Sequence, residues 1–224
     1  MVKVELLSYT PDPERTIASA ARLCYSDLDG DKLYQDLSDK EVIKLVKKLR
    51  EMGHLSTFEH ASFTFAIAGV SRVLTHQLVR HRIASYSQRS QRYVNENNFE
   101  YVIPKTIEKN EEALEIYRKF MEQSKQIYET LNQFVPQEDA RYVLPNATET
   151  KIIVTMNARS LLHFFEVRCC NRAQLEIRTL ANKMLKLVKE AAPTVFSIAG
   201  PTCETKGICN EGDLSCGRIK ELEN

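Results

Sequence analysis

Apolar side chains recur along this chain with two different periods, one typical of helices and one typical of strands. Pro13 precedes an alanine-rich stretch that predicts a helix over residues 13–27, because proline fits well in a first helical turn. Ser38 and Glu41 have the spacing of a capping box and predict the start of a second helix, which Gly53 ends.

A strand is predicted over residues 61–70, where Phe63, Phe65 and Ile67 alternate with smaller or polar residues. The segment HLSTFEH just before it is predicted to be a loop. The segment after it, residues 71–82, returns to a helical pattern.

The second half of the chain predicts one long helix and a mixture of shorter elements. The long amphipathic helix spans residues 108–135 and stops before Pro136. The other predicted elements are a short helix ending at Leu144, a strand over 148–157, a buried helix over 157–168 and an amphipathic helix over 173–191. Since strands and helices mix without strict βαβ alternation, we predict an α+β (mixed α/β) fold with an antiparallel-type sheet and long helices.

Length and composition favour a single domain followed by a tail. A chain of 224 residues can bury a sizeable core, and no linker or internal repeat divides it. Four of the seven glycines and three of the six cysteines follow Pro193. We therefore expect a domain over 1–192 and an irregular tail over 193–224.

The net charge of +1 gives the whole molecule no strong field toward nucleic acid or an anionic membrane. The first residues do not resemble a signal peptide, and no long apolar run is present, so we expect a cytoplasmic protein. In that compartment six cysteines are expected to be thiols.

A local basic segment stands out against this neutral background. No acidic residue occurs between Glu59 and Glu96, and five arginines do: Arg72, Arg80, Arg82, Arg89 and Arg92. Ser85, Ser87, Gln88, Ser90 and Gln91 add uncharged hydrogen-bonding groups. Because arginine binds phosphate with two parallel hydrogen bonds, the segment predicts an anion site, with a solvated basic face as the alternative.

Side chains would have to hold any nucleotide, because neither a GxGxxG fingerprint nor a GxxxxGK[ST] loop is present. Arg168 shares a helical face with Leu161, Phe164 and Phe165, which predicts an inward-facing arginine. Such an arginine favours a ligand pocket over the alternative, a structural ion pair.

Histidine and cysteine spacings do not indicate a metal at the core of the site. His54, His60, His76 and His81 match no zinc pattern. The tail cysteines Cys203, Cys209 and Cys216 lack paired CxxC spacing, so a loose tail with incidental thiols is the default and a metal or redox role the alternative. Cys24 is expected to pack in its helix, and Cys169 and Cys170 show no base that would activate a nucleophile.

Several motifs together resemble the flavin-dependent thymidylate synthase family. Arg80-His81-Arg82, followed by seven residues and Ser90, is similar to the signature of that family. GHLSTFEH, THQLVRHR, DARYVLP and MNARSLLHFF resemble further family segments and occur in the expected order. Together the similar segments cover residues 20–175.

The resemblance implies a homotetramer of mixed α/β subunits with active sites shared at subunit interfaces. FAD would be bound outside any Rossmann motif. The implied FAD contacts are Ser56, Glu59, Arg80, His81, Arg82, Gln88, Asn157, Arg159 and His163, with His54 nearby. The implied dUMP contacts are Gln77, Arg80, Gln88, Arg89, Ser90, Arg92, Arg141 and Arg168.

The implied reaction is the reductive methylation of dUMP to dTMP, a de novo dTMP synthesis. Its carbon donor would be 5,10-methylenetetrahydrofolate and its reductant NADPH, acting through bound FAD. Arg168 would be catalytic, because it could stabilise the anion formed when uracil N3 loses its proton. No metal, nucleic acid or membrane is expected.

The chain departs from the common family pattern at Gln88, Cys24 and His163, where glutamate, serine and asparagine are frequent. A second hypothesis is a nucleic-acid-binding module, in which Arg80–Arg92 track a backbone while Tyr86 and Tyr93 stack on bases.

Overall fold

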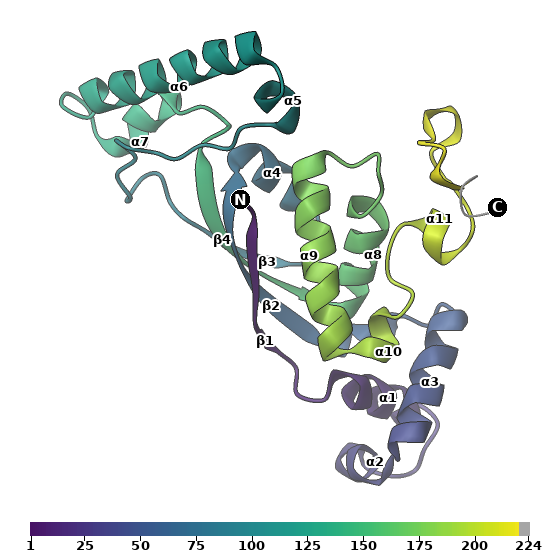
Figure 1. The fold of residues 1–224 in the computed structure, drawn as a ribbon. Coiled ribbons are helices and arrows are strands. Elements are labelled where there is room, and N and C mark those ends of the chain that lie inside the picture. Colours follow the sequence, from purple (N-terminus) through teal and green to yellow (C-terminus); the bar gives the residue numbers. More distant parts are fainter. Residues whose placement is uncertain (220–224) are drawn as a thin grey trace. The chain divides into compact units, whose positions relative to one another are not determined.

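The computed structural model describes residues 1–219 and has a mixed α/β fold (Figure 1). Its elements, with 3-10 helices written η, are β1 (Lys3–Tyr9), α1 (Pro13–Leu23), α2 (Gly30–Asp36), α3 (Asp39–Glu51), η1 (Ser56–His60), β2 (Ser62–Ser71), α4 (Arg72–Leu78), β3 (Ser85–Gln88), α5 (Lys105–Glu108), α6 (Glu111–Leu131), α7 (Gln137–Ala140), η2 (Arg141–Val143), β4 (Glu149–Asn157), α8 (Ala158–Arg168), α9 (Leu175–Ala191), α10 (Pro193–Phe196), α11 (Thr202–Thr205) and η3 (Gly212–Leu214).

The four strands form one sheet in the order β1-β2-β4-β3. Strands β1 and β2 run in opposite directions. At one end of the pair, a Cβ added to Gly69 of β2 would meet the carbonyl of Met1, just before β1. At the other end, the N–H of Thr10, just after β1, donates to the carbonyl of Ser62 of β2. Close approach and a φ of +70° both require glycine at position 69. The predicted mixed α/β fold with an antiparallel-type sheet is confirmed, and the sheet is small.

Two compact units divide the chain, and each contains segments that are distant in sequence. Unit 1 comprises Met1–Lys3, Ile67–Arg80 and Tyr86–Ile153. Unit 2 comprises Val4–Ala66, His81–Ser85 and the described residues from Val154 onward. The chain passes between the units within strands and within the basic segment, which is why no linker marks the division in the sequence.

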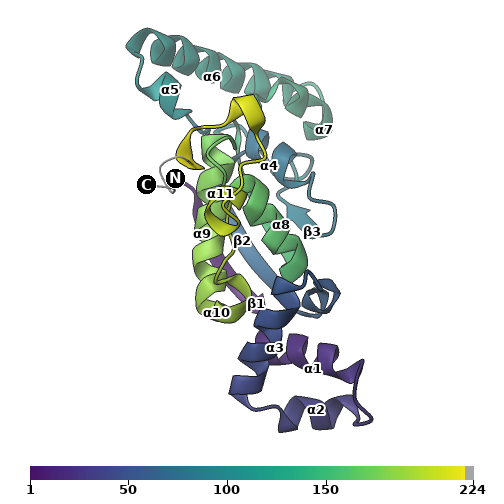
Figure 2. The same ribbon diagram turned by 90° about the vertical axis from the view of Figure 1, so that its right-hand side faces the viewer.

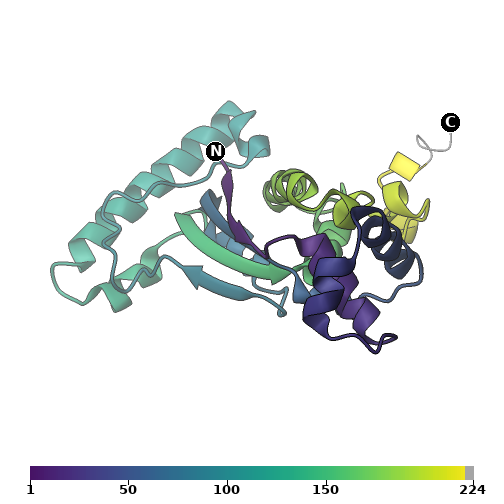
Figure 3. The same cartoon turned by 90° about the horizontal axis from the view of Figure 1, so that it is seen from below.

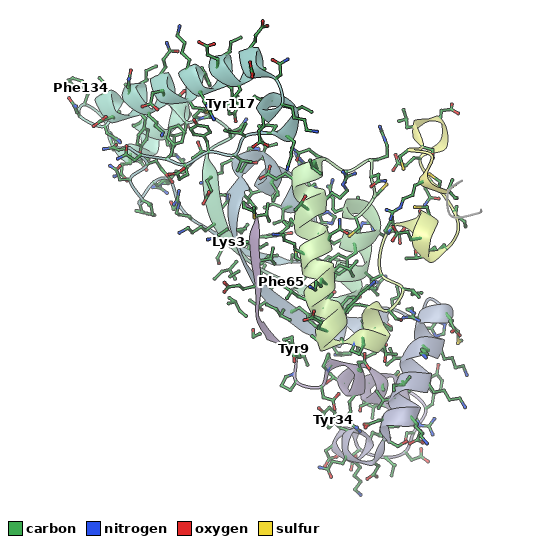
Figure 4. The ribbon with its side chains drawn as sticks, viewed as in Figure 1. Lys3, Tyr9, Tyr34, Phe65, Tyr117 and Phe134 are labelled. Carbon is green, nitrogen blue, oxygen red and sulfur yellow. The ribbon has the colours of Figure 1, made fainter. Side chains whose placement is uncertain are left out.

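In unit 1, the long helix α6 packs on the segment that precedes α5 (Figure 3). Tyr128 is fully buried, and its hydroxyl accepts a hydrogen bond from the N–H of Glu96 at 3.3 Å. Tyr117 donates to the carbonyl of Val102 at 2.8 Å, whereas Phe134 beyond the end of α6 is 78% exposed (Figure 4). Only part of the apolar face predicted for this helix is therefore buried in the core.

In unit 2, aromatic rings join β2 to α8 and α10. Phe196 of α10 contacts Phe63 of β2 edge-on, with centroids 5.4 Å apart, and Phe165 of α8 at 6.0 Å. All three are fully buried. Tyr9 stacks on Phe63, with ring centroids 5.9 Å apart. Helix α9 runs beside α8 (Figure 2) and buries Ile177, Leu180, Met184 and Val188 of its predicted apolar face.

Helix boundaries follow the predicted signals where a capping side chain sets them. Ser38 and Glu41 form both hydrogen bonds of the capping box at the start of α3, and Gly53 follows its end with a φ of +71°. Ser71 caps α4, which ends at Leu78 and not at residue 82 as predicted. Leu74 and Leu78 are buried, whereas position 82 is exposed, so burial no longer supports another turn.

Several local predictions were wrong or incomplete. The predicted loop HLSTFEH contains η1, the elements β1, α2 and β3 were missed, and Cys24 is exposed at the end of α1 and is not packed. The segment after residue 192 was expected to be irregular, yet α10 is buried at its start and α11 and η3 follow. The expectation for residues 220–224 lies outside the described residues.

Candidate active site

The predicted flavin contacts in unit 2 come from η1, the turn after α4 and helix α8. Asn157 caps α8: its side-chain oxygen accepts a hydrogen bond from the N–H of Ser160 at 2.8 Å. Arg159, the second residue of the helix, forms an ion pair with Glu59 of η1 at 2.6 Å. The structure therefore brings together two segments that lie 100 residues apart in sequence.

His81 lies at the centre of a second set of contacts within unit 2. The Nε of Arg168 donates to His81 Nε2 at 3.1 Å. The His81 ring lies 6.0 Å from the ring of His163 and meets Phe164 edge-on at 5.0 Å. Thus His81, His163 and Arg168, each predicted as a ligand contact, are neighbours.

The charge states of this cluster follow from its environment. Burial, with smaller contributions from Arg168 and His163, lowers the pKa of His81 to about 4. Imidazole is therefore neutral near pH 7 and can accept the hydrogen bond from Arg168. Arg168 itself is partly buried, which lowers its pKa, so the arginine predicted to face inward still reaches solvent in part. Among the described residues, its other guanidinium N–H groups have no hydrogen-bond partner.

Most of the predicted flavin contacts in unit 2 are exposed. Ser56, Arg82 and His54 are exposed, as are Glu59, Arg159 and His163. Asn157 is partly buried, and its capping role leaves its amide nitrogen available to donate to a ligand.

Acidic side chains lie close to the arginines of the basic segment in unit 1, although none occurs within the sequence of that segment. Arg89 donates from Nη2 to both carboxylate oxygens of Glu96, each at 2.8 Å. Arg92 pairs with Glu138 at 2.8 Å. The absence of acids within the segment therefore does not extend to its surroundings, because chain folding brings acids from outside the segment to these arginines.

Glu96 is 3% exposed, and burial raises its pKa while Arg89 and Arg72 oppose that shift. The amide nitrogen of Gln88 is also engaged, donating to Thr75 at 3.1 Å and to Thr150 at 3.3 Å. The hydroxyl of Ser90 accepts from the N–H of Arg92 at 3.2 Å. Of the other predicted dUMP contacts, Arg80 is exposed and Gln77 partly buried.

A cleft of about 330 Å³ lies within unit 1 and holds Arg141, one of the predicted dUMP contacts. Its lining is Arg72, His76, Gln91, Arg141, Tyr142, Leu144, Pro145 and Asn146. The Nη2 of Arg72 donates to the carbonyl of Arg89 at 3.1 Å, while its Nε is buried without a hydrogen-bond partner. A buried N–H that lacks a partner is costly, so this cleft is suited to an anion.

Arg72 and His76 were not predicted as ligand contacts. Burial lowers the pKa of Arg72, and the charges of Arg89 and Arg141 lower it further, whereas Glu96 raises it. Several charged side chains therefore act on Arg72. Arg72 and His76 are four residues apart on α4, which puts both side chains on one helical face. The four-residue spacing of Arg72 and His76 within the basic segment was the sequence signal that could have identified them as ligand contacts.

Comparisons with known proteins agree with the motifs. The family model described as thymidylate synthase complementing protein matches residues 5–194. A flavin-dependent thymidylate synthase from Clostridium tetani is 51% identical over 99% of this chain and 96% of its own length. Proteins of the same name from Geobacter sulfurreducens and Pyrococcus furiosus are 52% and 47% identical, covering 99% and 96% of this chain and 97% and 91% of their own lengths.

No helix within residues 1–219 is long and apolar enough to cross a membrane. The family match spans both groups of contacts, including the basic segment that also suggested a nucleic-acid-binding module. Because the family model and the relatives cover nearly the whole chain, this protein belongs to the flavin-dependent thymidylate synthase family.

Proposed function

We propose that this chain methylates dUMP reductively to dTMP in the cytoplasm, with bound FAD, NADPH as reductant and 5,10-methylenetetrahydrofolate as carbon donor. The observation that carries the proposal is the hydrogen bond between Arg168 and His81. It joins a predicted nucleotide contact to a predicted flavin contact inside one unit.

The donor groups of unit 2 are suited to a flavin dinucleotide held by side chains. Arg82, Arg159 and His163 offer exposed donors, and two of them are cations that can meet a diphosphate. The amide nitrogen of Asn157 adds a neutral donor at the start of α8. Glu59 pairs with Arg159 and fixes the direction of that side chain. When bound, FAD would supply the hydride chemistry that no side chain can perform.

The proposed role of Arg168 follows from its surroundings. Neutral His81 accepts the N–H of Nε and orients the guanidinium without adding a like charge. The remaining N–H groups could then donate to a uracil ring that has lost its N3 proton, which raises electron density at C5. Partial burial strengthens this interaction relative to water.

Unit 1 is proposed to hold the nucleotide phosphate. Arg141 and Arg72 supply two guanidinium groups to the cleft, and Gln91 supplies an amide. Arg89 supports this arrangement in part through its backbone, because its carbonyl accepts a hydrogen bond from Arg72. Arg80, Gln77, Gln88, Ser90 and Arg92 remain proposed dUMP contacts.

One visible absorption experiment on wild type and Arg168→Ala tests this function. Purified wild-type protein should be yellow, NADPH should bleach it without oxygen, and adding dUMP with the folate should restore the colour and yield dTMP. Arg168→Ala should keep the flavin absorbance and lose at least about 100-fold in dTMP formation, as expected when a donor to a developing anion is removed.

Arg118→Ala is the matched control, because Arg118 is an exposed arginine on α6 and should change neither readout. Near-normal dTMP formation by Arg168→Ala would show that its assigned role is wrong. A colourless protein that still forms dTMP would contradict the use of FAD.

A further inference from the structure

Four of the six cysteines line a second cavity, which the proposed reaction does not use. This cavity, of about 160 Å³, lies within unit 2 between the end of α8 and the tail. Its cysteines are Cys170, Cys203, Cys209 and Cys216. The sequence shows no paired spacing for these thiols, so only folding brings Cys170 to the other three.

Two ion pairs hold the tail beside the end of α8. Lys206 pairs with Glu166 at 3.2 Å, and Arg172 pairs with Glu211 at 3.8 Å. Arg218 also pairs with Glu204 inside the tail. These contacts follow Cys203 in the chain and hold the tail beside the end of α8, where the thiols share one cavity.

Cys170 and Cys203 are the two cavity cysteines best placed to react with each other. Cys170 follows the end of α8 and Cys203 lies in α11, both line the cavity and are partly buried, and Cys170 acts electrostatically on the Cys203 thiol. Cys209 instead donates to the hydroxyl of Ser215 at 3.4 Å, within its own segment of the tail. All six cysteines are free thiols, so both members of the pair are available to react.

A metal ion is the alternative use of a thiol cluster. Within residues 1–219, no three histidine, cysteine or acidic side chains are grouped as ligands of one ion would be. Two sulfurs suffice for a disulfide, whereas a structural zinc site needs four ligands. The described geometry therefore favours a disulfide.

We propose that Cys170 and Cys203 form a reversible disulfide that fastens the tail to the end of α8. The oxidant would be a small-molecule disulfide such as oxidised glutathione. The Cys170 thiolate attacks one sulfur of that molecule, the small S–S bond breaks, and one thiolate leaves and takes up a proton. The Cys203 thiolate then attacks the Cys170 sulfur and releases the second small thiolate, which also takes up a proton.

The order of the two attacks follows from the surroundings of the two thiols. The N–H of Arg172 donates to the sulfur of Cys170 at 3.5 Å, which favours the thiolate of Cys170, whereas burial raises the pKa of Cys203. Cys203 is therefore the resolving thiol and Cys170 the first to react. Since Cys170 lies two residues after Arg168, the bond would restrain the end of the helix that carries this arginine.

Mass spectrometry of the full-length protein after treatment with oxidised glutathione tests the proposal. Wild type should lose two titratable thiols, and its peptide map should show Cys170 linked to Cys203, with full reversal by dithiothreitol. Cys203→Ser should retain one glutathione on Cys170, because its resolving thiol is missing. Cys170→Ser should form neither product.

Cys24→Ser is the matched control and should behave like wild type, since Cys24 is exposed and outside the cavity. A link between Cys209 and Cys216 alone, or unchanged thiols, would overturn the proposal. So would stoichiometric zinc in the purified protein that disappears in Cys170→Ser and Cys203→Ser. None of these readouts depends on dTMP formation, so this proposal can fail while the proposed function stands.

Discussion

Individual residues gained partners in the structure that their sequence neighbours do not indicate. Arg89 and Arg92 lie in a segment without acids, yet each pairs with a carboxylate. The two pairs differ in burial: Glu96 is 3% exposed, whereas the Glu138 side chain is 48% exposed. This difference allows the two ion pairs to be compared within one segment.

Glu96→Gln is expected to lower the free energy of unfolding by about 3 kcal/mol, because it leaves the Arg89 charge without its buried partner. Glu138→Gln is the matched control and should cost less than about 1 kcal/mol, since exposed pairs are screened by solvent. Urea unfolding of the three proteins measures both changes. Equal losses in the two variants would show that the burial of Glu96 does not set the strength of its pair.

Among the elements, α10 shows how far the fold continues beyond the predicted domain end. The segment Pro193–Phe196 is short and follows a proline, and from sequence it reads as the start of a loose tail. Its N–H groups at Thr194 and Val195 donate to Glu14 of α1, and Arg50 of α3 donates to the carbonyl of Thr194 at 2.7 Å. These contacts are invisible to a local pattern, because α1 and α3 lie far away in sequence.

Phe196→Ala should lower the free energy of unfolding by about 3–5 kcal/mol, because the lost ring leaves a cavity between β2 and α8. The same substitution at Phe134, which is 78% exposed, should change it by no more than about 0.5 kcal/mol. Chemical denaturation followed by circular dichroism tests the pair. A small loss at Phe196 would mean that unit 2 does not depend on α10.

At the scale of the whole molecule, the predicted contacts divide between two units. Arg141 and its cleft belong to unit 1, as do Arg80 and Gln88, whereas Arg168, His81 and the other groups proposed to hold flavin belong to unit 2. The resemblance implies a homotetramer in which different chains complete each active site. We propose this assembly for the present chain.

A mixing experiment tests the shared sites. Arg141→Ala and Arg168→Ala should each form little dTMP alone, but the two co-expressed should regain a measurable part of the wild-type rate. Mixed oligomers can combine an intact unit 1 from one chain with an intact unit 2 from another. Light scattering should give the mass of four chains.

Co-expression of His81→Ala with Arg168→Ala is the matched control. Both changes lie in unit 2, so no mixed oligomer contains an intact unit 2. An active monomer, or no recovery in the first mixture, would argue against sites shared between chains.

By itself, the sequence determined the helices and strands with strong local signals. The capping box of Ser38, the alternation around Phe65 and the apolar face of α9 were correct because neighbouring residues decide them. The ordered motifs determined the family as well, which the comparisons confirmed. The weakly patterned β1 and β3 were missed, since pairing with other strands stabilises them more than local preference does.

Only the tertiary structure decided which charges and thiols meet. Glu96 reaches Arg89, Arg168 reaches His81, and Cys170 shares a cavity with Cys203. Each of these contacts depends on packing between separate elements, and charge interactions act over ångströms in space and not over residues in sequence. For that reason the chemistry of the basic segment could be predicted in kind, whereas the partner of each arginine could not.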